Sequence, residues 1–179
     1  MKGAAKMGFL HIYCGDGKGK TTAALGLAVR AAGAGMRVHI IQLLKGSDTA
    51  ELSVLRGIPG ITLTRCDRNY GFFNTMTDAD KAEITLCHNS LLEEGYSLVR
   101  AGKVDMLIID EFNAAYCLDL IDRKAAEQFL TEKPGNAELV ITGRDPAEIF
   151  VEAADYVSEI KCVKHPYSQG VNARRGIEY

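Results

Sequence analysis

The sequence predicts an α/β fold in which a mostly parallel β-sheet is covered by helices on both faces. Short, near-continuous apolar runs alternate with helical patterns along the 179 residues. That order builds parallel sheets from strand–helix–strand units. Apolar residues make up 47% of the chain, enough for a sizeable core. No repeat, low-complexity segment or linker divides the sequence, so we expect a single α/β domain over residues 1–179.

The first half of the chain supplies three expected strands. Residues 9–13 form a short apolar run bounded by glycine, which indicates a buried strand. An alanine-rich stretch with apolar residues at helical spacing covers residues 21–34 and ends between two glycines, as helices commonly do. Residues 38–44 and 61–64 are the next two expected strands.

A long helix and a fourth strand occupy the middle of the chain. Residues 77–101 have the helical pattern, Thr77 suits the N-cap, and the acidic residues after it suit the first turn. Residues 106–109 form an apolar strand that ends in two carboxylates, Asp110 and Glu111.

The remaining expected elements continue the alternation. A helix over residues 122–131 precedes a strand over residues 139–142. Asp145 is expected to cap a helix that starts at Pro146, because proline suits the first helical position. Residues 156–160 form the last expected strand.

Two segments show no clear periodicity. Residues 45–76 are rich in Gly, Arg, Asn and Thr and are expected to form irregular loops over the site. Residues 161–179 form a C-terminal tail. In a parallel sheet, binding belongs at the carboxyl ends of the strands, so the site is expected there.

Composition excludes several classes of function. The 21 basic and 23 acidic residues give a net charge of −2, which argues against a nucleic-acid partner. The sequence contains no run of about 18 apolar residues, so no membrane span is expected. No signal-peptide core follows the N-terminus, so a cytoplasmic protein is expected. The five cysteines have no close pair and are expected as reduced, mostly buried thiols.

A glycine-rich loop follows the first expected strand and reads C-G-D-G-K-G-K-T-T over residues 14–22. Its end matches the phosphate-binding pattern G-x-x-x-x-G-K-[ST], with Cys14 at the first glycine position. Backbone N–H groups and a helix N-terminus would surround the phosphates. The expected ATP-binding residues are Gly15, Asp16, Gly17, Lys18, Gly19, Lys20, Thr21 and Thr22.

The carboxylates after the fourth strand support this reading. An apolar strand that ends in an acid is how phosphate-binding folds place a carboxylate beside Mg²⁺. We therefore expect Thr21, Asp110 and Glu111 to hold Mg²⁺, or Mn²⁺ in its place, with ATP. Lys18 and Lys20 supply positive charge, and Glu111 is a candidate catalytic group. These residues alone do not separate a hydrolase from a kinase.

Several segments together resemble one family, the ATP:corrinoid adenosyltransferases of the CobA/CobO/BtuR type. The loop and the A-A that follows it are similar to the family's G-N-G-K-G-K-T-T-A-A, and residues 42–46 to its Q-F-x-K-G. Residues 110–113 resemble D-E-L-N, and residues 141–144 match I-T-G-R. The tail from Val163 resembles V-K-H-x-(F/Y)-x-x-G-(I/V)-x-A-x-x-G-I-(D/E)-(F/Y), which ordinary phosphate-loop proteins lack.

The resemblance implies a RecA-like P-loop NTPase fold and a defined reaction. The Co(I) of a reduced corrinoid attacks the 5′ carbon of ATP, and triphosphate leaves, in the biosynthesis of adenosylcobalamin. Because Co(I) is itself the nucleophile, no general base is needed. The protein's task is to align the reactants and to stabilise charge on the triphosphate. The resemblance also implies a homodimer and an electron-donating reductase or flavoprotein.

One departure concerns the corrinoid. Family members commonly carry G-F-T-W after the third strand, where this chain has Gly71, Phe72, Phe73 and Asn74, and the protein contains no tryptophan. The family's aromatic residues approach the lower face of the corrinoid. The expected corrinoid-binding residues are Phe72, Phe73, Asn74 and Lys45, with core packing as the alternative role for the two phenylalanines.

Two other functions remain open at this level. One is a P-loop NTPase or kinase acting on another substrate. The other is a non-catalytic paralogue that binds ATP or a corrinoid, an alternative that the missing tryptophan keeps open.

Overall fold

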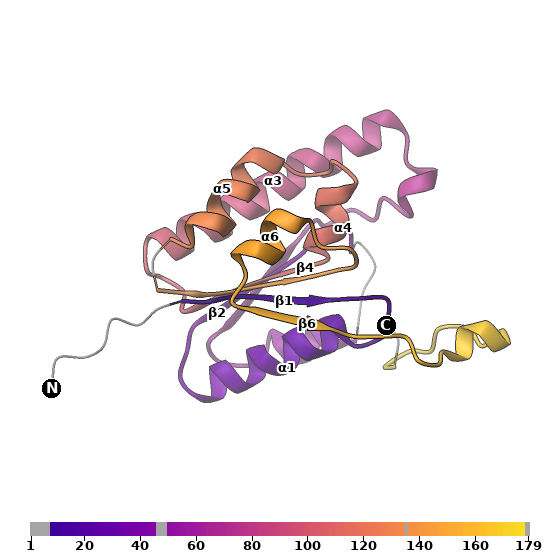
Figure 1. Ribbon diagram of the computed structural model, residues 1–179, viewed down its shortest axis with the longest axis horizontal. Helices are drawn as coiled ribbons and strands as arrows, with labels where there is room; N and C mark the ends of the chain where they lie inside the picture. Colours follow the sequence, from indigo (N-terminus) through magenta and orange to yellow (C-terminus); the bar gives the residue numbers. More distant parts are fainter. Residues whose placement is uncertain (1–7, 46–49, 135, 178–179) are drawn as a thin grey trace, which may run out of the picture.

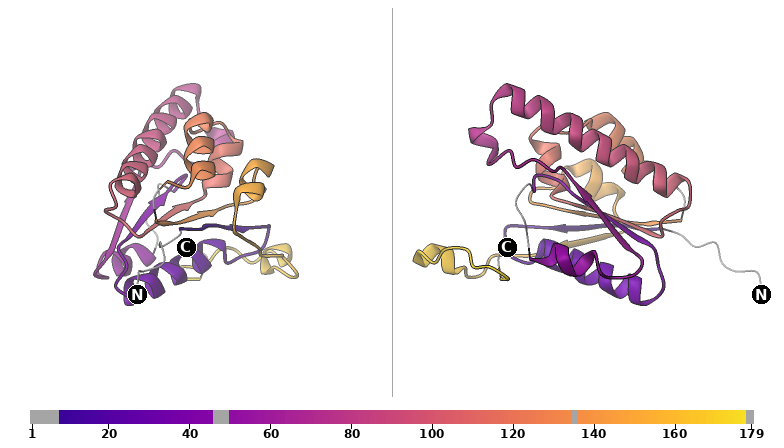
Figure 2. Two further views of the ribbon diagram at one scale, coloured as in Figure 1. Left: turned by 60° about the vertical axis from the view of Figure 1, so that its left-hand side comes forward. Right: turned by 180° about the vertical axis from the view of Figure 1, so that it is seen from behind.

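The structure is a computed structural model that describes residues 8–45, 50–134 and 136–177. A twisted sheet forms the central layer, with α1 (Lys20–Gly33) and α2 (Glu51–Leu55) on one face and the other α-helices on the opposite face (Figure 1). Figure 2 shows the same layers from two further sides. The predicted α/β fold with helices on both faces is confirmed.

The sheet has six strands in the order β3-β2-β4-β5-β1-β6. Every described pair is parallel, so all carboxyl ends lie along one edge. The strand bounds are β1 Leu10–Cys14, β2 Val38–Gln42, β3 Ile61–Arg65, β4 Met106–Asp110, β5 Glu138–Thr142 and β6 Tyr156–Glu159. Strand β5 lies between β1 and β4, and this order determines which residues meet at the site.

The second helical layer contains α3 (Asp78–Arg100), α4 (Phe112–Cys117), α5 (Arg123–Glu132) and α6 (Glu148–Ala153). The long helix α3 begins where the sequence predicts, because Asp80 N donates a hydrogen bond to Thr77 Oγ1 and Thr77 N donates one to the Asp80 carboxylate. This reciprocal capping box satisfies donors that the helix leaves without partners. Single 3₁₀ turns occur at Phe73–Thr75 (η1) and Pro166–Gln169 (η2).

Each face of the sheet has its own apolar core. Alternate strand residues pack on α1 through Ala24, Ala28 and Ala31, whose small side chains bring the helix close to the sheet. The other face packs on α3, α4, α5 and α6 and buries Phe112, Phe129 and Phe150 completely. Burying such aromatic side chains contributes roughly 2–3 kcal/mol each. The cores fix the sheet edge on which the site is built.

The structure differs from the expected elements in two helices, one strand end and one helix cap. Two short helices, α2 and α4, are not indicated by the sequence. Strand β2 ends at Gln42 rather than at residue 44, because Leu44 has a left-handed backbone (φ 57°). The expected cap at Asp145 is wrong: α6 begins at Glu148, and Asp145 lies in a turn with φ 41°.

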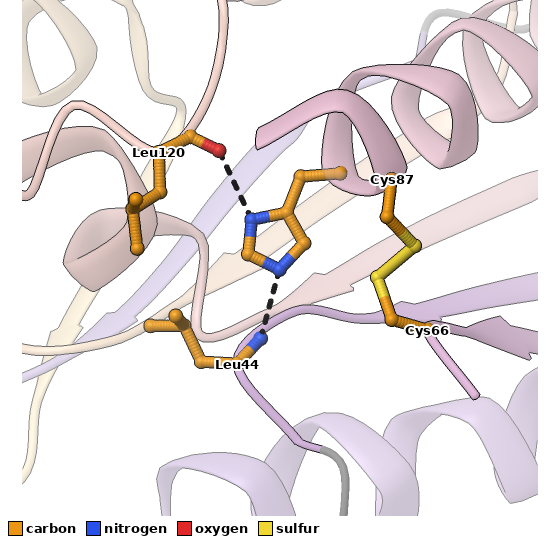
Figure 3. Close-up of a disulfide and its surroundings, with 5 residues drawn as sticks. Leu44, Cys66, Cys87 and Leu120 are labelled. Carbon is orange, nitrogen blue, oxygen red and sulfur yellow. Dashed lines mark hydrogen bonds between the residues drawn. A yellow bond between two sulfur atoms is a disulfide. The ribbon is translucent and has the colours of Figure 1, made fainter. Parts of the chain in front are cut away.

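The expectation of five reduced, mostly buried cysteines is also wrong. Cys66, just after β3, and Cys87, on α3, form a disulfide across a Cα–Cα distance of 6.1 Å (Figure 3). Of the three free cysteines, Cys14 is buried, whereas Cys117 and Cys162 are exposed. The disulfide joins the end of β3 to the middle of α3.

No helix among the described residues is long and apolar enough to cross a membrane.

Candidate functional site

The site lies at the carboxyl edge of the sheet, on the face covered by α1. Asp110 is the last residue of β4 and is in register with Gln42 on β2. Gln42 is in turn in register with Arg65 on β3. Side chains alternate between faces along a strand, and the alternate residues of β2 and β4 pack on α1. The edge therefore presents Asp110 and Gln42 toward the N-terminus of α1.

The phosphate-binding loop rests against the chain that follows β6. Gly17 N donates to Ile160 O at 2.8 Å, and Asp16 accepts a hydrogen bond from Cys162 N at 2.9 Å. This bond, more than any other contact, lowers the pKa of Asp16. A Cβ at Gly15 or Gly17 would lie 2.5 or 2.7 Å from Ile160 O, so only glycine allows this close approach.

Two loop residues mark the start of α1. Lys20 is its first residue, and its ammonium donates to Gly17 O at 2.8 Å within the loop. Thr21 follows, and its hydroxyl donates to Asp110 Oδ1 at 2.9 Å. The loop and the strand-end carboxylate, predicted separately, are therefore in direct contact. Lys18 and Thr22 are solvent-exposed on either side of them.

Asp110 is completely buried and accepts three hydrogen bonds. Thr21 and Thr142 donate to Oδ1 at 2.9 and 2.6 Å, and Lys45 donates to Oδ2 at 2.5 Å. Thr142 is the last residue of β5, the strand between β1 and β4, so its hydroxyl lies beside the carboxylate. Two hydroxyls and one ammonium therefore satisfy the buried carboxylate.

The structure brings Lys45 to the phosphate-binding loop. Its ammonium lies 2.5 Å from Asp110 Oδ2 and 3.5 Å from Thr21 Oγ1, and only 22% of its side chain is exposed. Lys45 was expected to contact the corrinoid, and that contact stays a prediction. Its observed neighbours give it a second role, as a positive charge beside the loop.

Glu111 occupies a strained position next to Asp110. Its backbone is left-handed (φ 59°), and its N–H donates to Thr142 Oγ1 at 3.0 Å. Burial raises the pKa of the Glu111 carboxyl, and the neighbouring charge of Asp110 raises it further. Backbone strain and a perturbed pKa together are common at functional sites.

The oxygen atoms around Asp110 suit a small hard cation. Mg²⁺ prefers oxygen ligands and usually takes one or two carboxylates together with phosphate oxygens and water. The Thr21 hydroxyl donates to Asp110 and accepts one long hydrogen bond from Lys45, which leaves one lone pair on its oxygen available. Gln42 is fully buried nearby, and neither of its amide atoms has a hydrogen-bond partner. The described residues contain no cluster of three His, Cys, Asp or Glu side chains able to hold a metal alone. Thr21 and Asp110 therefore fit Mg²⁺ that is shared with a nucleotide.

A cavity of about 720 Å³ adjoins the loop. Polar groups at its loop end come from Thr21, Thr22 and Lys45, and its walls are mainly apolar side chains of α1, α2 and the tail. Most of its lining is carbon, as in pockets that bind large organic ligands. The site thus joins a phosphate-binding end to an apolar recess.

The expected corrinoid-binding aromatics lie in the segment after β3. Phe72 is 85% exposed, which is not the core packing considered as its alternative role. Phe73 packs against the small cluster formed by Met76, Ile84 and Leu120, and Lys81 Nζ lies 4.7 Å from its ring centroid. Asn74 is exposed in η1.

The sequence reading missed the residues that connect the two motifs at the strand ends. Thr142 links Asp110 to the backbone of Glu111. Asn113, two residues after Glu111, donates to Gly143 O at 3.3 Å, and a Cβ at Gly143 would lie only 2.8 Å from Asn113 Cβ. The segments D-E-F-N and I-T-G-R were the available signal, because each begins at the end of an apolar strand.

Comparison with known proteins gives one family. The family described as ATP:corrinoid adenosyltransferase BtuR/CobO/CobP matches residues 6–179. A corrinoid adenosyltransferase from a Sinorhizobium species is 32% identical over 96% of this chain and 80% of its own length. The corrinoid adenosyltransferase of Escherichia coli K12 is 31% identical over 96% of this chain and 86% of its own length.

Similar solved structures identify the fold. A KaiC-like protein from Pyrococcus horikoshii has a TM-score of 0.52 at 16% identity, covering 85% of this chain and 71% of its own. EssC (ATPases 2 and 3) from Geobacillus thermodenitrificans has a TM-score of 0.54 at 13% identity, covering 96% of this chain and 36% of its own. At these identities the likeness concerns the fold alone, and it agrees with the RecA-like P-loop arrangement.

Proposed function

The chain belongs to the ATP:corrinoid adenosyltransferase family, and from that premise we propose how its residues divide the work of the reaction. The enzyme transfers the adenosyl group of ATP to a corrinoid in cobalamin biosynthesis. The bond that forms joins cobalt to the 5′ carbon, and the bond that breaks releases triphosphate. The electron pair of Co(I) forms the new bond, so the protein supplies binding and charge rather than a base.

The loop stabilises the leaving triphosphate. As the 5′ C–O bond breaks, negative charge builds on the bridging oxygen and spreads into the phosphates. Lys20 and Lys45 lie at this end of the site with their ammonium groups on Gly17 O and Asp110, and each can exchange that partner for a phosphate oxygen. Lys18, which lies in the same loop as Lys20, is exposed and adds a third positive charge to the site. Preorganised positive charge of this kind is commonly the largest contribution to catalysis.

Thr21 and Asp110 would hold Mg²⁺, or Mn²⁺, which when bound adds positive charge against the phosphates. Glu111 lies one residue away, and the raised pKa of its carboxyl reflects burial beside Asp110. We assign Glu111 to the ligand environment of the cation rather than to proton transfer, because the attacking Co(I) carries no proton to remove.

The assembly and setting follow from the same premise. We propose a cytoplasmic homodimer that receives its corrinoid from an electron-donating reductase or flavoprotein. The edge strand β6 supports a subunit contact, since all four of its residues are solvent-exposed. In the cytoplasm thiols are kept reduced. We therefore expect Cys66 and Cys87 to be free thiols in the cell and to form the disulfide on oxidation.

The hydrogen bond from Thr21 to Asp110, which joins the phosphate-binding loop to the strand-end carboxylate, carries this proposal, and product analysis tests it. The protein is incubated anaerobically with ATP, Mg²⁺ and chemically reduced corrinoid. We expect the spectrum of a Co–C bond together with one triphosphate for each adenosylated corrinoid. Release of phosphate without adenosylation would indicate a hydrolase or kinase. Binding without any product would indicate a non-catalytic paralogue.

Asn74→Trp tests whether the segment after β3 lies beneath the corrinoid. An indole at this exposed position would exclude water and an axial base from the lower face of cobalt, which makes Co(II) easier to reduce. We expect a few-fold higher rate when a weak reductase supplies electrons, and no gain with chemically pre-reduced Co(I). An unchanged rate in both assays would place Asn74 away from the cobalt, and an equal loss in both would indicate a clash.

A further inference from the structure

His88 is a fully buried polar side chain outside the phosphate-binding loop and the strand-end carboxylates. It lies on α3, and its ring bridges two other segments (Figure 3). Nδ1 lies 3.0 Å from Leu120 O, and Nε2 lies 3.2 Å from Leu44 N. A carbonyl only accepts and a backbone N–H only donates, so Nδ1 carries the proton and Nε2 accepts. Burial lowers the pKa of His88 to about 4, so the ring is neutral near pH 7.

The bond from Leu44 lies where the chain leaves the sheet. Leu43 N still donates to Asp110 O at 3.1 Å, but Leu44 adopts a left-handed backbone (φ 57°), which is uncommon for a residue other than glycine. A residue in this conformation persists only when its surroundings hold it there. The His88 ring supplies the hydrogen-bond acceptor for the Leu44 N–H.

The residue after Leu44 is Lys45, whose ammonium lies 2.5 Å from Asp110 Oδ2. The direction of the Leu44 backbone therefore sets where the Lys45 side chain starts. The position of His88 is held by the packing of α3 on the sheet through Leu92, Tyr96 and Val99.

We infer that His88 is a positioning residue for the transfer reaction: by accepting the Leu44 N–H, it directs Lys45 toward the triphosphate-binding end of the site. The inference rests on the proposed function for its consequence in turnover, but not for its effect on triphosphate binding. His88 acts through Lys45 and does not itself contact substrate.

Two substitutions separate the two bonds of the ring. In His88→Asn, the amide stands near the former Nδ1, where it can still donate to Leu120 O but cannot reach Leu44. In His88→Gln, the amide extends to the former Nε2 and can accept the Leu44 N–H. The control is His39→Asn, which removes another buried histidine, bonded to Thr62 and Thr64 on the neighbouring strand and not to Leu44.

The probe is inorganic triphosphate, with binding measured by calorimetry in the absence of corrinoid. We expect His88→Asn to weaken binding about tenfold, the effect of losing one well-placed charged hydrogen bond. His88→Gln and His39→Asn should stay close to the wild type. Lys45→Met should lose affinity as His88→Asn does, and adding His88→Asn to Lys45→Met should cost nothing more, because the two residues act through one contact.

Three results would overturn the inference. The first is wild-type affinity for triphosphate in His88→Asn. The second is an equal loss of affinity in all three histidine variants, in proportion to the fall in their melting temperatures. The third is a loss in the double variant that equals the sum of the two single losses. A failure of the proposed function is distinguishable, since it would appear in the products of the transfer assay while triphosphate binding still reports on His88 and Lys45.

Discussion

Lys20→Ala lowers the rate of adenosyl transfer by about 100- to 1,000-fold, the usual loss when a preorganised charged contact to the transition state is removed. Lys20 begins α1, and its ammonium lies on the loop's own backbone, 2.8 Å from Gly17 O. Charge on the leaving triphosphate is greatest when the 5′ C–O bond breaks, so the loss should appear mainly in kcat. The rate is measured with saturating ATP and pre-reduced corrinoid.

The matched control for Lys20 is Lys124→Ala, an exposed lysine on α5, on the face of the sheet opposite α1. It should leave the rate unchanged. A Lys20→Ala enzyme that works within a few-fold of the wild type would refute the assignment of the loop to the triphosphate.

Asp110→Asn is expected to lower the rate by about 100-fold or more and to raise the Mg²⁺ concentration needed for half-maximal activity. The carboxylate is 1% exposed and accepts bonds from two hydroxyls and from Lys45. An amide cannot neutralise the Lys45 ammonium, which is left partly buried without a counter-charge. We therefore expect the melting temperature to fall as well. Activity is titrated against Mg²⁺, and unfolding is followed without nucleotide.

Asp105→Asn is the control for this effect, because Asp105 precedes β4 at the opposite end of the same strand. It pairs with Arg37, a half-exposed side chain, and such surface pairs contribute little. Its Mg²⁺ titration should match the wild type. If Asp110→Asn also keeps the normal Mg²⁺ titration and rate, the cation is held by other residues.

The sequence anticipated most strands and long helices because their signals are local. The apolar runs that became β1, β4 and β5 are each determined by their own residues, and Thr77 marks the start of α3 through contacts three residues away. The short helices α2 and α4 were not predicted, because five or six residues are too few to show a helical period. The stability of such short helices depends on tertiary packing. Asp145 is a residue type that commonly caps helices, but it lies in a turn, and α6 begins three residues after it, at Glu148.

The sequence by itself determined that the protein has a phosphate-binding loop, a strand-end acid and a parallel sheet, because spacing within a short segment fixes each of them. Only the tertiary structure decided which distant residues meet. Lys45 reaches Asp110 across 65 positions, His88 reaches Leu44 across 44, and Cys66 pairs with Cys87 across 21. These contacts depend on strand order and on the packing of α3 over the sheet. Strand order and helix packing are set by the burial of both cores together, which no local pattern encodes.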